Sequence, residues 1–81
     1  MPHARPPQPA EIRTLQAELE SAVKAHQAGR IDEAEATYMK ILDRVPTQPD
    51  ALNLLGVIQA ERNRHERALD LLQRASRVRP K

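Results

Sequence analysis

Apolar residues recur at helical spacing in successive segments of the chain. Within a segment they are mostly three, four or seven residues apart, which is the pattern of an amphipathic helix that buries one face. The positions that share this spacing are Ala34, Tyr38, Ile41 and Leu42 in one segment, Leu52, Leu55, Gly56 and Gln59 in the next, and Ala68, Leu71, Leu72, Ala75 and Val78 in the last. Together with the polar segment before them, they predict helices at roughly 11–28, 31–44, 49–62 and 65–78, and no strand.

Residues that favour turns separate these segments. Gly29 suits the first turn because glycine reaches left-handed backbone angles without steric cost, and Asn63 suits the second as the next most tolerant residue. Pro46 and Pro49 interrupt the chain between the second and third helices, and Pro49 is compatible with a first helical turn. Asp32 is the predicted N-cap of the second helix.

The small and turn-forming positions also repeat along the chain with a period of 34 residues. The matched pairs are Ala17 with Ala51, Ala22 with Gly56, Val23 with Val57, Ala34 with Ala68, Ile41 with Ala75, and Pro46 with Pro80. Such a period is typical of stacked helical hairpins, in which small residues mark where two helix backbones come close.

These residues resemble the tetratricopeptide repeat (TPR) family. The second repeat matches at Leu52, Leu55, Gly56, Ala68, Leu72, Ala75 and Pro80, and the first keeps Ala22, Gly29, Ala34, Tyr38 and Pro46. The resemblance implies an all-α fold of two stacked antiparallel helical hairpins, a fragment of an α-solenoid with a right-handed superhelix. We expect a flexible Pro-rich tail at 1–10 and a helical domain at 11–81, with repeats at about 15–48 and 49–81.

The resemblance implies that the chain is a protein-protein interaction module, which presents a helix-lined groove to a peptide or a helical partner. Carried over by position, the groove residues are Gln16, Leu19, Val23, His26, Gln27, Asp50, Asn53, Val57, Ala60 and Glu61. Some family members clamp a peptide carboxylate with Lys and Asn, but Leu19, Val23 and Leu54 stand at those positions. Leu19 and Val23 form an apolar strip instead, which suits a partner's side chains.

An alternative is the N-terminal targeting array of a larger enzyme. Bacterial glycosyltransferases and related transferases often begin with divergent repeats that include a stretch similar to residues 26–35. A native reading frame that ends after Lys81 would exclude this alternative.

The chain is short and poor in large side chains, which limits its core. It has 81 residues and no Trp, Phe or Cys, and Tyr38 is the only aromatic residue. Stacked repeats usually need about three units and a polar cap, so two repeats indicate a fragment of a longer array. The alternative is a homodimer, with Leu69 and Val78 as candidates for the exposed contact.

Charge and chemistry-bearing residues exclude several classes of function. Residues 61–81 carry a net charge of +4, but no aromatic residue accompanies these basic side chains, so nucleic-acid binding is not expected. His3, His26 and His65 lack the spacing of metal ligands or of an acid–base pair, so we expect no catalytic, metal or cofactor site. No signal peptide or long apolar run is present, which favours a cytoplasmic protein without a membrane segment.

Overall fold

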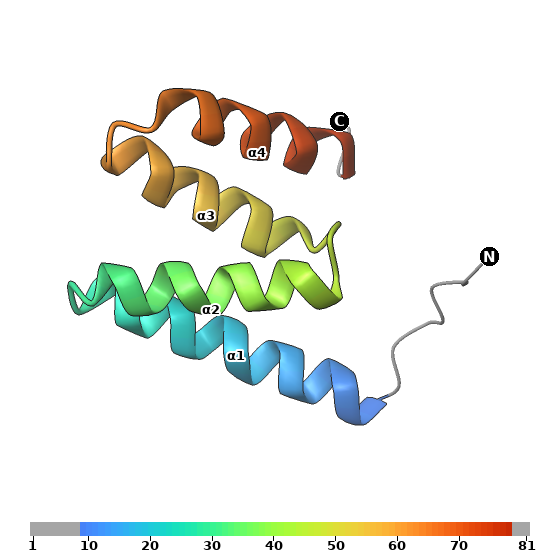
Figure 1. The fold of residues 1–81 in the computed structure, drawn as a ribbon. Coiled ribbons are helices and arrows are strands. Elements are labelled where there is room, and N and C mark those ends of the chain that lie inside the picture. The colour runs from blue at the N-terminus through green and yellow to red at the C-terminus, as the bar shows by residue number, and fades with distance from the viewer. Residues whose placement is uncertain (1–8, 79–81) are drawn as a thin grey trace.

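The chain folds into four consecutive α-helices, each packed mainly against the next (Figure 1). The computed structural model describes residues 9–78, so the expected tail over residues 1–8 and the predicted role of Pro80 lie outside the described residues. The helices are α1 (Pro9–Gln27), α2 (Ile31–Arg44), α3 (Pro49–Glu61) and α4 (His65–Val78). These bounds differ from the expected ones by two residues at most, and the largest difference is the earlier start of α1 at Pro9.

The two turns within the hairpins have the same geometry, as the sequence predicts. Gly29 has φ of 84° and Asn63 has φ of 62°, so each occupies the left-handed region. After each of them, a backbone N–H reaches five residues back to close the preceding helix: Arg30 donates to the carbonyl of Ala25, and Arg64 to that of Gln59. This is the Schellman pattern, which satisfies carbonyls at the helix end.

The N-terminus of α3 is capped by a side chain, whereas that of α2 is not. At α3, the Gln48 side chain accepts a hydrogen bond of 2.7 Å from the Ala51 N–H, and Pro49 occupies the first turn as predicted. The prediction of Asp32 as the N-cap of α2 is wrong, because the turn at Gly29 places Arg30 at the cap and starts the helix at Ile31. Asp32 is therefore already helical, and its carboxylate binds Arg62, the residue that follows α3, instead.

The core runs along the middle of the stack and consists of small and aliphatic residues around one tyrosine. Its fully buried larger side chains are Tyr38, Ile41, Leu52 and Ile58. Burial of one such aliphatic side chain contributes about 1.5–3 kcal/mol. Ala22 and Ala25 are buried between α1 and the rest of the stack, and Ala34 is their counterpart on α2. The alanines allow the helices of the first hairpin to approach closely.

The prediction that Leu72 is buried is wrong. Ala68 and Leu71 are buried in α4, but Leu72 is 37% exposed. The reason is the position of α4 at the end of the stack: α2 packs against both α1 and α3, whereas α4 packs mainly against α3. The apolar face of α4 is therefore wider than the one helix that covers it.

Candidate functional site

A hollow lies between α1 and α3, where the sequence predicts a groove. Its volume is about 500 Å³. The residues that line it are Leu19, Glu20, Val23, Lys24, Gln27, Asp50 and Leu54. Those from α1 form two adjacent rows at a spacing of four residues, so they share one face of the helix.

Four of the predicted groove residues line this hollow: Leu19, Val23, Gln27 and Asp50. Three further lining residues were not in the predicted set, namely Glu20, Lys24 and Leu54. Helical spacing could have predicted each of them from its neighbours in the predicted set. Glu20 and Lys24 directly follow Leu19 and Val23, and Leu54 lies one turn after Asp50 on the same face of α3.

Two more predicted residues meet beside the hollow instead of lining it. The Nε2 atom of His26 lies 2.8 Å from Oε1 of Glu61, so the C-terminal ends of α1 and α3 are joined by a polar contact. These two residues are 35 positions apart in sequence. The contact ties the two helices that border the hollow, and so it helps to fix their separation.

The other predicted groove residues do not line this hollow. Gln16, Val57 and Ala60 are exposed on the surfaces of α1 and α3. Asn53 lines a different hollow, between the start of α3 and the second half of α4. The predicted groove residues therefore lie on the same two helices as the hollow, but on more than one side of each.

The composition of the α1/α3 hollow is apolar at its centre and charged around it. Leu19, Val23 and Leu54 are each partly exposed there, and the carboxylates of Glu20 and Asp50 flank them together with Lys24. Three charged side chains give this surface a net charge of −1 at neutral pH. The arrangement favours an apolar side chain and disfavours a terminal carboxylate.

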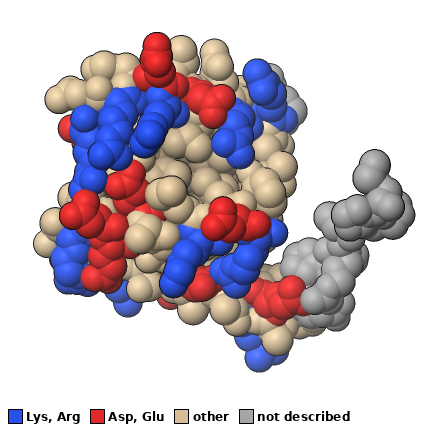
Figure 2. Space-filling model, viewed as in Figure 1, with Lys and Arg blue, Asp and Glu red and all other residues tan. Residues whose placement is uncertain are grey.

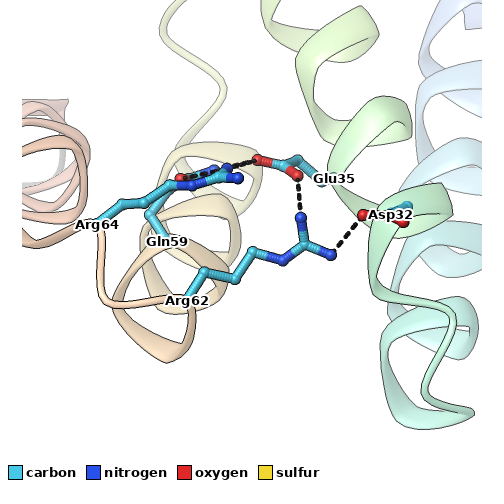
Figure 3. Close-up of polar contacts among 5 residues, drawn as sticks. All are labelled: Asp32, Glu35, Gln59, Arg62 and Arg64. Carbon is cyan, nitrogen blue, oxygen red and sulfur yellow. Dashed lines mark hydrogen bonds and ion pairs between the residues drawn. The ribbon is translucent and has the colours of Figure 1, made fainter.

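A polar cluster connects the two hairpins at the turn end of α2 and α3 (Figure 3). Gln59 is only 3% exposed, and its Nε2 donates to Oε2 of Glu35 at 2.5 Å. Arg62 and Arg64 donate to the same carboxylate at 3.0 and 2.9 Å. Arg62 also donates to Asp32, and this hydrogen bond is the main cause that raises the pKa of the guanidinium.

This cluster explains how the polar side chain of Gln59 can be buried. Its amide stays in the core because Glu35 accepts from one end and Arg64 donates to the other, which satisfies both polar atoms. Sequence reasoning did not find the cluster, because its members lie 24 to 30 residues apart and on two helices and a turn.

Tyr38 is the one aromatic side chain, and it is completely buried. Within the described part of the chain, its hydroxyl has no hydrogen-bond partner. Burial, together with the negative charge of Asp50, raises the pKa of the phenol above its usual value of 10.0. The phenol is therefore neutral at physiological pH, and it acts as a large packing residue.

The two residues predicted for self-association are both exposed, Leu69 at 57% and Val78 at 37%. They are nine residues apart, which is about two and a half helical turns. They therefore lie on opposite sides of α4.

Within residues 9–78, no three side chains of the metal-ligating types cluster, and no helix combines the length and apolar character needed to cross a bilayer. Acidic and basic side chains are interspersed on the face viewed in Figure 2, with no large patch of one sign.

Comparison with protein families gives a match over residues 19–80 to the model described as "Tetratricopeptide repeat". Neither the curated proteins nor the solved structures give a significant match. The family match covers most of the chain, from the second half of α1 through α4, and the four helices form two hairpins. Repeats of this family generally mediate protein–protein interactions and are typically non-catalytic. The chain is a member of the tetratricopeptide repeat family.

Proposed function

We propose that this chain is a protein-interaction module that binds an extended or helical segment of a partner protein on the α1/α3 face. The observation that supports this most directly is the hollow with Leu19, Val23 and Leu54 at its centre. A volume of about 500 Å³ is sufficient for one or two large side chains of a partner. The charged residues around it provide polar contacts that orient the segment.

The charges around the hollow restrict the segment further. Lys24 is exposed and makes no ion pair within residues 9–78, so it can bind a carbonyl or an acidic side chain. Glu20 and Asp50 give the surface its net negative charge, which opposes a strongly acidic segment. The expected ligand therefore places an aliphatic or aromatic side chain in the hollow and carries little net negative charge.

A quantitative binding experiment tests this assignment. Partners captured with the immobilised chain are identified by mass spectrometry, and the dissociation constant of a fragment of each is measured by calorimetry. Val23→Asn should raise that constant by about tenfold or more, because it places an amide in the apolar centre. Ala60→Asn is the control, since Ala60 is an exposed residue of α3 outside the hollow. Equal binding by both variants, each with the parent circular dichroism, would contradict the proposal.

The same surface would serve a free-standing module or the targeting array of a larger enzyme. In the second case, its segment partner would bring the enzyme to its substrate. The length of the native reading frame distinguishes the two.

A further inference from the structure

Because the sequence repeats every 34 residues, each residue of α4 can be compared with the residue 34 positions earlier on α2. On α2, which packs against both α1 and α3, Tyr38 and Ile41 have no exposed surface. The residues 34 positions later are Leu72 and Ala75, and neither is fully buried. Within residues 9–78, the side of α4 that corresponds to an interface inside the stack is therefore uncovered.

The uncovered side is apolar and borders a hollow. Glu35 binds α3 through the polar cluster, and its counterpart on α4 is Leu69, which is 57% exposed. Leu69, Leu72 and Ser76 follow a spacing of three and four residues, so they form a continuous strip, called here the α4 edge. Beside it is a hollow of about 400 Å³ that also includes Pro49, Asp50, Asn53 and Ala75.

The opposite end of the stack lacks a complementary apolar surface. The buried residues of α3 include the aliphatic side chains Ala51, Leu52, Leu55 and Ile58. The α1 residues 34 positions earlier are Ala17, Glu18, Ser21 and Lys24, which are small or polar and at least partly exposed. Head-to-tail stacking would thus place the α4 edge of one copy on a polar surface of the next. A contact between two α4 edges buries apolar residues on both sides.

We propose that the α4 edge binds the α4 edge of a second copy, in an antiparallel arrangement about a two-fold axis between Leu69 and Leu72. In this arrangement Leu69 of one copy meets Leu72 of the other, and the reverse contact occurs by symmetry. Such an interface is closed, so it produces a dimer and no filament.

The charges of α4 are complementary in this arrangement. Glu66 and Arg77 are eleven residues apart, or about three turns, and so they flank the edge on the same side. Within the described part of the chain, neither makes a hydrogen bond or an ion pair. The antiparallel axis brings Glu66 close to the partner's Arg77 twice per dimer. A parallel arrangement would instead leave Glu66 and the partner's Arg77 eleven residues apart along the helix axis, so this pair could not form.

The interface is small, because it uses mainly one helix from each copy. Interfaces below about 1,200 Å² are usually weak and transient, so the dissociation constant is expected in the micromolar range or above. The dimer would leave the α1/α3 hollow open, since no residue of the α4 edge lines it.

Sedimentation velocity from about 5 µM to about 1 mM covers this affinity range and tests the proposal. The parent chain should change from monomer to dimer with concentration, and Leu69→Lys should weaken the dimer by about tenfold or more. Val78→Lys is the matched control, because Val78 is also exposed but lies on the other side of α4. A parent chain that stays monomeric throughout, or a dimer weakened equally by both variants, overturns the proposal.

Charge reversal tests the antiparallel register separately. Glu66→Arg and Arg77→Glu should each weaken the dimer, since each places like charges opposite each other twice, and the double variant should restore it. If the dimer of the double variant is weaker than the dimer of either single variant, this register is wrong. Circular dichroism of every variant separates dissociation from unfolding. Binding of a partner segment at the α1/α3 hollow should be unchanged in Leu69→Lys, so the two proposals can fail independently.

Discussion

Gly56 occupies the closest approach between α3 and α4, and Gly56→Ala tests how tightly the second hairpin is packed. A Cβ atom at this position would lie 2.9 Å from Cδ2 and 3.0 Å from Cγ of Leu72, and 3.5 Å from Cβ of Leu71. The last distance is an ordinary contact. The first two are too short, so Leu72 must move or the helices must separate.

Two effects of opposite sign decide the outcome. Alanine is favoured over glycine in a helix interior by about 1 kcal/mol. Against this, an added methyl group in a close-packed site costs about 1–3 kcal/mol. The Cδ2 of Leu72 can move by rotation about the Cβ–Cγ bond, whereas its Cγ moves only if the side chain changes its χ1 rotamer, which costs more. We therefore expect Gly56→Ala to lower the free energy of unfolding by about 1 kcal/mol, or about 4–8 °C in melting temperature.

Urea denaturation followed by circular dichroism measures this effect at a protein concentration below that of the proposed dimer. In a Leu72→Ala background the obstruction is absent, so Gly56→Ala should become stabilising by about 1 kcal/mol, which gives a coupling energy of about 2 kcal/mol. Gly29→Ala is the control: nothing lies within 4 Å of its added Cβ, but φ of 84° strains alanine. Its cost should not depend on Leu72. Gly56→Ala that stabilises equally in both backgrounds would refute the reasoning.

Three further predictions concern buried groups. Ala68→Glu places a charge in the buried α3/α4 contact and should unfold the domain, with a cost of several kcal/mol, visible as lost helical circular dichroism. Because the pKa of Tyr38 is raised in the folded state, its contribution to the free energy of unfolding is present below pH 10.0 and is lost as the pH rises above that value. Tyr38→Phe should remove this loss of stability at alkaline pH, measured by urea titration. At neutral pH the variant should be at least as stable as the parent, because it lacks the hydroxyl that is unpaired within residues 9–78. Glu35→Gln should lower the free energy of unfolding by about 1–3 kcal/mol, because three donors lose a charged acceptor. At the exposed Glu33, the same substitution should change the free energy of unfolding by less than about 0.5 kcal/mol.

The helices and turns were predictable from the sequence because their determinants are local. Apolar spacing defines each helix, and Gly29 and Asn63 are residues that tolerate the left-handed region that the turns require. The N-cap of α2 was not predictable in the same way. Asp32 is a good capping residue by type, but the hydrogen bond from Arg30 to Ala25 fixes where the turn ends and the helix begins.

The candidate site was only partly predictable, because it depends on contacts between helices. The family spacing identified α1 and α3 as its two sides, but not the side of each helix that faces the hollow. Leu72 shows the same limit: it is the counterpart of the buried Tyr38 in the repeat, but it is exposed because, within residues 9–78, α4 packs mainly against one helix whereas α2 packs against two. The burial of Gln59 could not be read from its residue type, because it depends on Glu35 in another repeat.

The order in which the helices pack along the stack affects how fast the chain folds and where it opens. Each helix packs mainly against its neighbours in sequence, so most contacts close only short loops. Helical domains with such low contact order fold within microseconds to milliseconds. Because α1 and α4 each have one main neighbour whereas α2 and α3 have two, the ends should also open more often than the middle. Amide hydrogen exchange should therefore be slowest in α2 and α3 and become faster toward both ends of the chain.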